Sequence, residues 1–572
     1  MKQHSFVKSL PLVLTTLLAL PLGARGEEVA ARTTPLVTAQ NGMVVAQEAI
    51  AVRIGVEILR KGGNAVDAAV AVGFAMAVSY PRAGNLGGGG FMVIHRSGGG
   101  DTVLDYRETA PAAITATSFL DAQGNADPQK SRESALGIGV PGTVAGLALA
   151  EAKYGSGHFT LAELLAPAIA LARDGIVVTD DTADSLPVDR PRLARWPSSA
   201  KIFLKADGSA LGPGDELVQP DLAATLSAIA KNGPRAFYEG AVAEKIAAAV
   251  QAAGGVMTAA DLKDYRALER EPVRGTYRNY DIVSMPPPSS GGVALIEMLN
   301  ILEGYDLARQ DRPQALFLMV ETMKRAYADR AWFLGDPDRV QIPVARLTSK
   351  SYAAQWRATI DPQRATPAGE IHAGAIVERE GHNTTHFSVI DRYGNAVSNT
   401  YTINFSYGVG LVAEGTGVLL NNELDDFAAK ANAPNAYGLL GDAANEPAPG
   451  KRPLSSMTPT IVLKDGRPFL VTGSPGGSFI INVVLQIVSN VIDRGMDIAS
   501  AVSAPRLHDQ WMPDRVMAEP ALPADLIAAL QARGETVVVR PLTTSANSIL
   551  VTPAGITGAA DPRTRGALAE GY

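Results

Sequence analysis

The stretch that decides the fold runs from residue 382 to residue 404 and reads HNTTHFSVIDRYGNAVSNTYTIN. Its β-branched and aromatic residues predict two strands, Thr385 to Asp391 and Asn395 to Asn404. Only Arg392-Tyr393-Gly394 connects them, and a three-residue loop with glycine in the left-handed position is a favoured hairpin connection. The stretch therefore predicts an antiparallel hairpin.

The length of this loop fixes which residues of the hairpin face each other. With a three-residue loop Asp391 faces Asn395, and continuing the ladder brings Thr402 opposite Thr384. A loop one residue longer would bring Thr402 opposite Thr385 instead. The sequence thus favours two facing threonines at the start of the first strand.

Thr384 is the candidate nucleophile. A threonine hydroxyl needs a base within reach, and a free α-amine, with a pKa of about 7.7 to 8.0, can serve as that base on the same residue. An internal Thr384 has only an amide nitrogen, so we expect the bond between Asn383 and Thr384 to break first. The Thr384 hydroxyl could attack the Asn383 carbonyl, forming an ester that water cleaves, with Thr402 positioning the attack. Taken alone, a Thr-Thr pair in a strand is more often explained by β-propensity.

Metal binding is the alternative for the same stretch, because His382 and His386 have the i, i+4 spacing of a helical zinc site. The intervening residues lack a general-base glutamate, and the residues that follow favour a strand, in which the two imidazoles would not share a helical face. Ordinary hydrogen-bonding histidines are therefore the preferred interpretation.

The composition argues against several classes of function. The 572 residues include 51 basic and 58 acidic ones, a net charge of −7, without a block of like charges. Neither nucleic acid nor anionic lipid is therefore an expected partner. The chain has no cysteine, which rules out disulfides, thiolate catalysis and cysteine-ligated metals. Length alone would suggest about three or four domains.

The N-terminus predicts export. Lys2 and Lys8 precede an apolar run, Leu10 to Leu22, which is followed by the small residues Gly23 and Ala24. The run is shorter than the roughly 20 residues that a membrane-spanning helix needs, so a signal peptide over residues 1–24 is favoured over a membrane anchor. We expect cleavage after residue 24 or 26 and a periplasmic or secreted protein.

Two helices are expected early in the mature chain. Residues 47–61 have apolar positions at helical spacing. Asn64, with Asp67 three residues later, predicts the N-cap of a second helix, Ala65 to Val78, which is apolar nearly all round and belongs in an interior.

The glycine run at residues 87–90 precedes two predicted strands, Phe91 to Ile94 and Thr102 to Tyr106. A phosphate-binding loop would continue into Gly-Lys-Ser/Thr at the start of a helix, whereas these glycines lead into apolar strand residues. A hairpin is therefore favoured over a nucleotide site.

The rest of the chain predicts a layered mixed fold. Residues 146–260 are expected to be mostly helical, whereas the pattern weakens over residues 343–381, which suggests a long, mobile surface segment. The last third contains short strands, such as Thr460 to Leu463 and Phe469 to Thr472, and one apolar helix, Ile480 to Ile492. Short turns between strands favour antiparallel pairing.

Several motifs follow one another in a familiar order. NTTHFSV at 383–389, DYRETAP at 105–111 and GSPGGS at 473–478 closely resemble signatures of the γ-glutamyltransferase (γ-glutamyltranspeptidase) family, bacterial type. Further similar segments are LRKGGNAVDAA at 59–69, the proline-rich turn at 286–292, NNELDDF at 421–427 and KRPLSSM at 451–457. Together they cover nearly the whole mature chain.

The resemblance implies an α+β fold of the N-terminal-nucleophile hydrolase type, a four-layer αββα sandwich. It implies a precursor that is cut before Thr384 into a large subunit, residues 25–383, and a small catalytic subunit, residues 384–572, which stay together as a heterodimer. In this likeness Thr384 is the nucleophile and Thr402 the assisting hydroxyl. No metal and no organic cofactor are expected.

The resemblance also assigns the substrate contacts. A γ-glutamyl group presents an α-carboxylate and an α-ammonium, so its recognition needs a planar cation and one or more anions. Arg107 is implied as the partner of the carboxylate, with hydroxyl donors from Ser455 and Ser456. The α-ammonium is assigned to Asp426, together with Glu423 and Asn404. Taken alone, two adjacent aspartates would more often form a solvated turn.

Three further positions surround the reacting bond. Gly476 and Gly477 are implied as backbone N–H donors to the oxyanion, although by themselves they would be read as an ordinary turn. The segment 433–438 resembles a lid loop, whose Tyr437 closes over the site. Phe479 departs from the polar or basic residue found in some bacterial relatives, which puts the preference for an acceptor in doubt.

The sequence therefore predicts a two-step acyl transfer from glutathione, or a similar amide, to water or to an amino acid or peptide. One alternative is an acylase of the same superfamily that removes a dicarboxylic side chain from a β-lactam and needs no partner for an ammonium group, so Asp426 favours γ-glutamyl chemistry. The other is a periplasmic binding protein that holds an amino acid with Arg107 and Asp426. Such a protein would not need Thr384 at the start of a hairpin.

Overall fold

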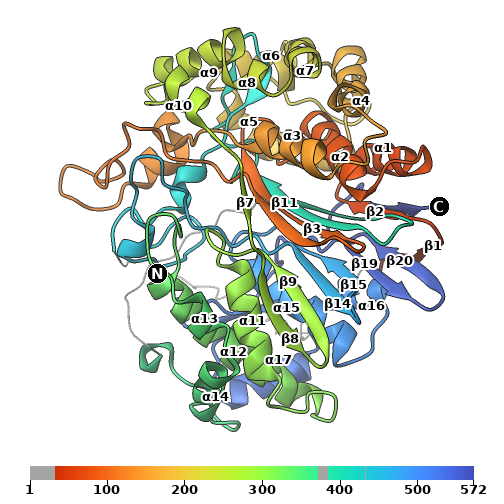
Figure 1. The fold of residues 1–572 in the computed structure, drawn as a ribbon. Helices are drawn as coiled ribbons and strands as arrows, with labels where there is room; N and C mark the ends of the chain where they lie inside the picture. Colours follow the sequence, from red (N-terminus) through yellow and green to blue (C-terminus); the bar gives the residue numbers. More distant parts are fainter. Residues whose placement is uncertain (1–32, 372–383, 432) are drawn as a thin grey trace, which may run out of the picture.

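The computed structural model describes residues 33–371, 384–431 and 433–572. Two seven-stranded sheets face each other at the centre, and helices cover the outer face of each, which gives four αββα layers (Figure 1). All neighbouring strands within these two sheets are antiparallel. The predicted layered α+β sandwich with antiparallel pairing is therefore confirmed.

The upper sheet in Figure 1 has the predicted hairpin at its centre. In spatial order its strands are β21 (Leu568–Gly571), β2 (Met43–Ala46), β10 (Thr385–Ile390), β11 (Ala396–Thr402), β3 (Gly89–Arg96), β4 (Gly100–Asp105) and β7 (Leu268–Arg270). Both hairpin strands are completely buried, because other strands flank them and both faces of the sheet are covered. The glycine-rich run before Phe91 leads into β3, so the predicted β3–β4 hairpin is also confirmed.

The lower sheet consists of short strands from the beginning, the middle and the last third of the chain. In spatial order these are β1 (Val37–Ala39), β20 (Gly555–Ala559), β19 (Ser548–Thr552), β15 (Arg467–Thr472), β14 (Thr460–Lys464), β9 (Tyr280–Ser284) and β8 (Val273–Tyr277). Side chains such as Val45 and Phe91 of the upper sheet meet Val283, Ile461 and Val471 of the lower one in a common apolar core.

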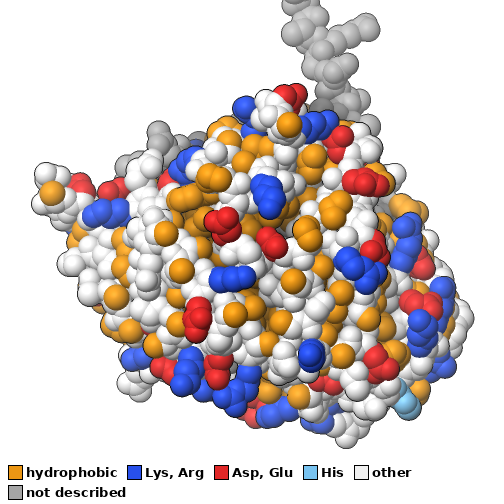
Figure 2. Space-filling view, turned by 90° about the horizontal axis from the view of Figure 1, so that it is seen from above, with side chains coloured by type: hydrophobic (Ala, Val, Ile, Leu, Met, Phe, Trp, Pro, Cys, Tyr) orange, Lys and Arg blue, Asp and Glu red, His pale blue; other side chains and the backbone are white. Residues whose placement is uncertain are grey.

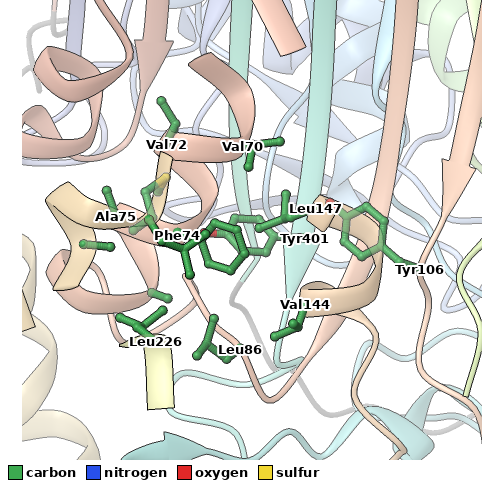
Figure 3. Close-up of a cluster of buried hydrophobic side chains, with 14 of the residues drawn as sticks. Val70, Val72, Phe74, Ala75, Leu86, Tyr106, Val144, Leu147, Leu226 and Tyr401 are labelled. Carbon is green, nitrogen blue, oxygen red and sulfur yellow. The ribbon is translucent and has the colours of Figure 1, made fainter. Parts of the chain in front are cut away.

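The helices above the upper sheet begin with α1 (Ala49–Arg60) and α2 (Ala65–Ser79). Asn64 caps α2 in a capping box with Asp67, as predicted, and every residue of α2 is buried. Figure 3 shows Phe74 of this helix among the apolar side chains that cover Tyr401 of β11. The remaining helices of this half are α3 (Thr143–Tyr154), α4 (Leu161–Asp174), α5 (Asp180–Leu193), α6 (Pro197–Phe203), α7 (Pro220–Asn232), α8 (Arg235–Tyr238), α9 (Ala241–Ala252) and α10 (Ala259–Asp264).

The helices below the lower sheet include α11 (Gly291–Leu302), α12 (Arg312–Phe333) and α15 (Phe479–Ile492), which enclose a second large core. The other helices there are α13 (Val344–Leu347), α14 (Lys350–Ala358), α16 (Ile498–Ser503) and α17 (Ala524–Ala532). Short strands outside the main sheets are β5 (Ile176–Val177), β6 (Glu216–Leu217), β12 (Val412–Ala413), β13 (Val418–Leu419), β16 (Leu507–His508), β17 (Val516–Ala518) and β18 (Val537–Val539).

The expectation of a mobile surface segment over residues 343–381 is wrong for its described part, which ends at residue 371. Helices α13 and α14 form there, and the side chains of Tyr352 and Trp356 both donate hydrogen bonds of 2.8 Å to Asp329 of α12. Helix α14 buries only Tyr352 and Ala353, so it leaves little apolar periodicity in the sequence. Residues 372–381 lie outside the described residues.

The surface is mixed in charge. Seen from above in Figure 2, Lys and Arg side chains alternate with Asp and Glu and with scattered apolar ones. In the part of the chain that the structure describes, no helix is long and apolar enough to cross a membrane. The predicted signal peptide, residues 1–24, lies outside that part.

Candidate active site

The hairpin has the predicted register. Thr385 pairs with Tyr401 and Ile390 with Ala396, and Gly394 has the expected positive φ of 85°. Thr384 directly precedes β10, and its hydroxyl lies 3.4 Å from the hydroxyl of Thr402 at the end of β11. The loop length thus brings the two threonines together, as the sequence predicts.

Hydrogen bonds of Asn404 hold the end of β11 in place. The N–H of Asn404 donates to the Thr402 hydroxyl at 2.8 Å, and Asn404 adopts a left-handed conformation with φ of 70°. Its side-chain amide donates to the carbonyl of Asn422 at 2.9 Å. A left-handed, buried asparagine is uncommon and is often found at a site that the surrounding structure shapes.

Arg107 follows β4 and is fully buried. Its guanidinium forms ion pairs with Glu423 and Asp426 and donates a hydrogen bond of 3.1 Å to the carbonyl of Pro453. Burial raises the pKa of Asp426 and of Glu423, although the positive charge of Arg107 opposes the rise. The predicted carboxylate partner, Arg107, thus forms ion pairs with two of the predicted ammonium partners.

Glu108 is a buried acid beside this cluster that the sequence interpretation missed. It lies 3.8 Å from the Arg107 guanidinium, and within the described residues neither of its carboxyl oxygens has a hydrogen-bond partner. Burial raises the pKa of Glu108 well above its ordinary value, and the nearby carboxylate of Glu423 raises it further. Gly89 of β3 leaves room for it, because a Cβ there would lie 2.6 Å from a Glu108 oxygen.

Arg330 is a second cation that the sequence interpretation missed. It is buried in α12 and donates to the hydroxyls of Ser290, at 3.0 Å, and Ser456, at 3.2 Å. Burial lowers the pKa of Arg330 to about 10, which still leaves it charged. Ser455, the residue before Ser456, accepts a hydrogen bond from the N–H of Met457. Only the unusual number of charges within an otherwise buried helix could have drawn attention to Arg330.

Gly476 and Gly477 form the turn directly before α15, with positive φ values of 130° and 55°. The ring of Tyr437 packs on this turn so closely that a Cβ on Gly477 would lie 2.3 Å from it. The Tyr437 hydroxyl donates to the side-chain oxygen of Asn404. The predicted lid residue thus covers the predicted oxyanion turn.

Thr384 lies between two cavities. The smaller one, about 20 Å³, is lined by Arg107, Thr384, Thr402, Glu423, Asp426, Tyr437, Ser455, Ser456, Met457, Gly477 and Ile480. The larger one, about 380 Å³, is also lined by Thr384 and has Gly476 in its wall. Asn404 lines neither of these cavities but forms a hydrogen bond with Tyr437, which lines the smaller one. All the site residues predicted from the sequence therefore lie around Thr384.

His386 is a buried strand residue of β10. Its ring nitrogens lie 2.8 Å from the hydroxyl of Thr400 and 3.1 Å from that of Ser388. Burial lowers the pKa of His386 to about 3. The strand conformation agrees with the interpretation as a hydrogen-bonding histidine, while His382 lies outside the described residues. Over the described parts of the chain, no group of three or more His, Asp or Glu side chains is arranged to hold a metal ion.

Comparison with known proteins identifies the family. The family model described as gamma-glutamyltranspeptidase matches residues 51–571. This chain belongs to that family. The glutathione hydrolase proenzyme of Escherichia coli strain K12 is 49% identical over 539 residues, which cover 94% of this chain and 93% of that protein.

Solved structures of this and related families share the fold. A cephalosporin acylase from Bacillus halodurans superposes with a TM-score of 0.82 at 27% identity, over 98% of this chain and 99% of that one. The gamma-glutamyltranspeptidase of Helicobacter pylori superposes with a TM-score of 0.56 at 43% identity, over 60% of this chain and 96% of that one.

In this γ-glutamyltranspeptidase family member, Phe479 begins α15 and is buried. Its ring meets the ring of His508 edge-on, with centroids 4.5 Å apart. Phe479 is therefore part of the core behind the predicted oxyanion turn.

Proposed function

We propose that this chain is a γ-glutamyl hydrolase and transferase that uses Thr384 as its nucleophile after cleavage between Asn383 and Thr384. γ-Glutamyl chemistry by an enzyme made as a precursor follows from the family and from the glutathione hydrolase proenzymes related to it. The nucleophile and the cleavage site rest on one observation. The Thr384 hydroxyl lies 3.4 Å from Thr402, between two cavities.

Self-cleavage requires no other protein. The Thr384 hydroxyl attacks the carbonyl carbon of Asn383, the C–N bond breaks, and the acyl group moves to the hydroxyl oxygen as an ester. Water then hydrolyses the ester, which leaves a carboxylate on Asn383 and a free amine on Thr384. Thr402 orients the attacking oxygen, because its own hydroxyl is fixed by the N–H of Asn404.

Catalysis then uses the new amine as the base. It takes the proton of the Thr384 hydroxyl as the oxygen attacks the γ-carbonyl of the substrate, and the negative oxygen that develops faces the N–H groups of Gly476 and Gly477. The proton passes to the leaving amine and an acyl-enzyme ester remains. Water or a second amine attacks this ester and regenerates Thr384.

Substrate recognition is an exchange of ion pairs. The α-carboxylate replaces Glu423 and Asp426 on the Arg107 guanidinium, and the α-ammonium pairs with the two acids that this exchange releases. Arg330, through Ser456, adds positive potential on the carboxylate side. A zwitterionic γ-glutamyl group satisfies both halves of the cluster, whereas a side chain without an ammonium leaves two buried acids unpaired. The cluster thus favours γ-glutamyl amides over the β-lactam side chains of acylases.

The domain boundaries and the location belong to the same proposal. A signal peptide, residues 1–24, directs the precursor to the periplasm or the medium, and cleavage yields a large subunit, residues 25–383, and a small subunit, residues 384–572, which remain a heterodimer. No nucleic acid, membrane, metal or organic cofactor takes part.

The test combines cleavage with turnover. On a denaturing gel the wild type should give two fragments and Thr384→Ala a single one, and the small fragment should begin at Thr384 by mass spectrometry. A γ-glutamyl anilide should release its leaving group in a burst, and glycylglycine should accelerate turnover. Fully active protein in which residues 383 and 384 are still joined would overturn the mechanism.

A further inference from the structure

The lid residue Tyr437 is held from behind by a side chain outside the proposed catalytic machinery. Gln510 donates hydrogen bonds from Nε2 to the carbonyl oxygens of Tyr437, at 3.0 Å, and of Met512, at 3.3 Å. Two carbonyl acceptors on the same side of the amide fix which end is nitrogen. The amide oxygen of Gln510 therefore points the other way, towards His508, 2.9 Å from Nε2 of its ring.

The hydrogen bonds also fix the tautomer of His508. Asn482 donates from Nδ2 to the carbonyl of Asp509 at 2.7 Å, so its amide nitrogen also faces Nδ1 of His508, 2.7 Å away. Nδ1 must accept that bond, and the proton of the neutral ring is on Nε2, where Gln510 needs a donor. A continuous chain of hydrogen bonds thus runs from Asn482 of α15 through His508 and Gln510 to the lid.

Aromatic packing keeps the imidazole of His508 in place. Phe479 and Tyr327 meet it edge-on, with centroids 4.5 Å and 5.7 Å away and interplanar angles of 89°. His508 itself is 1% exposed. The position of Phe479 therefore contributes to the orientation of His508.

The lid must move for the substrate to enter. The cavity under Tyr437 has a volume of about 20 Å³, which is room for roughly one water molecule and not for a γ-glutamyl group. The lid segment is further tied by Asp425, which accepts a hydrogen bond of 3.0 Å from the N–H of Ala436. Opening and closing therefore depend on how strongly these few bonds favour the closed position.

We infer that His508 and Gln510 are positioning residues that hold Tyr437 closed over the acyl-enzyme and so set how that ester is divided between water and an acceptor. The inference rests on the proposed function, in which Thr384 carries the acyl group. Losing one hydrogen bond of ordinary strength should lower the ratio of closed to open lid about fivefold and so raise the population of the open lid by a similar factor. Water should then reach the ester more often.

Two variants and a matched control test this inference. Gln510→Met keeps the length of the side chain but removes the bond to Tyr437, and His508→Phe keeps the aromatic packing but removes the donor to Gln510. Gln486→Met is the control, because Gln486 is equally buried, 6% exposed, and bonds to the backbone of Leu507 without touching the lid. All three should self-cleave like the wild type.

Lid opening and partition are measured separately. Trypsin cleavage after the exposed Lys430, followed as the fragment that begins at Ala431, should be about fivefold faster in Gln510→Met and His508→Phe and unchanged in Gln486→Met. With a γ-glutamyl anilide and glycylglycine, the ratio of hydrolysis to transfer should rise by a similar factor.

The inference would be overturned if both lid variants had the wild-type trypsin rate and the wild-type ratio of hydrolysis to transfer. It would also be overturned if Gln486→Met changed these two quantities as the lid variants do. Failure of the proposed function would look different, because the wild type itself would then remain uncleaved at residue 384 or show no release of the anilide, whatever the trypsin rates are.

Discussion

At the level of single residues, Arg107 determines the charge balance of the site. It is a fully buried cation between two acids, Glu423 and Asp426, and a third acid, Glu108, lies 3.8 Å away with a pKa that burial raises. A buried charge that loses its partner is costly, whereas exchanging one partner for another of the same sign is not. The cluster is therefore suited to a zwitterion that replaces both pairs at once.

Replacing Arg107 should weaken substrate binding without preventing self-cleavage. Arg107→Ala should raise KM for a γ-glutamyl anilide at least about 100-fold, because a bidentate bond to a carboxylate contributes about 3 kcal/mol. Self-cleavage should proceed, since Thr384 and Thr402 do not contact Arg107 through any hydrogen bond in the described structure. Steady-state kinetics and a denaturing gel measure the two effects.

Arg270→Ala is the control for this change. Arg270 pairs with Asp105, two residues before Arg107, at 2.7 Å, but lines neither cavity beside Thr384. It should leave KM within about twofold of the wild type. An equal rise of KM in both variants would mean that Arg107 acts by supporting the loop and not by binding the substrate.

His386 should make stability depend on pH. Burial lowers its folded pKa to about 3, against an ordinary value of 6.5, so between these pH values the unfolded chain binds a proton that the folded chain does not. The free energy of unfolding should therefore fall as the pH falls from 6.5, by up to about 1.4 kcal/mol per pH unit. Urea unfolding at pH 7, 6 and 5 measures the slope.

His386→Asn should be less stable at pH 7 but should show a shallower slope between pH 6.5 and pH 5. If the slopes of wild type and variant agree, His386 does not carry the proton linkage.

The facing of Thr384 and Thr402 could be predicted from the hairpin alone, whereas the roles expected for Arg107, Asp426 and the glycines came from the family resemblance, and contributions that depend on burial could not be predicted. Thr384 became the candidate nucleophile because the family resemblance outweighs ordinary β-propensity, and Thr402 was placed opposite it because the hairpin loop has a fixed length. Glu108 and Arg330 were not predicted, since nothing beside them in the sequence shows that their side chains are buried next to the same charged cluster.

At the level of elements, the hairpin β10–β11 was predictable because its register is determined locally by three loop residues and by a period of two. Helix α14 was not, because its position depends on hydrogen bonds to Asp329 of α12, which lies 23 and 27 residues before the two donors. The order of the strands in the two sheets could not be predicted from the sequence pattern either, whereas their antiparallel pairing could.

The cap of α2 offers a test of an element's stability. Asn64 accepts hydrogen bonds from the N–H groups of Val66 and Asp67 and donates one to the carbonyl of Tyr154. Asn64→Ala should therefore lower the free energy of unfolding by about 1 to 2 kcal/mol. Thr160→Ala removes the cap of α4, which is exposed, and should cost only about 0.5 kcal/mol.

Urea unfolding measures both variants, and activity per cleaved molecule should stay at the wild-type level because neither residue lines a cavity beside Thr384. If the two substitutions lower the free energy of unfolding by the same amount, the burial of α2 does not increase the stabilisation that its cap provides.

At the level of the whole molecule, the two proposed subunits are interleaved. In the described residues, five strand pairs join a strand before residue 384 to one after it: β1–β20, β2–β10, β2–β21, β3–β11 and β9–β14. Both main sheets depend on these pairs, and the central hairpin has neighbours from the other subunit on each side. Cutting one peptide bond therefore leaves a single cooperative structure.

The cleaved wild type should accordingly unfold and dissociate in one step. Circular dichroism and size-exclusion chromatography should give the same urea midpoint, and this midpoint should rise with protein concentration, since unfolding releases two chains. Thr384→Ala, a single chain, should unfold at a midpoint that does not depend on concentration. Fragments that separate in mild urea while keeping their circular dichroism would show that each subunit folds by itself, which five shared strand pairs make physically unreasonable.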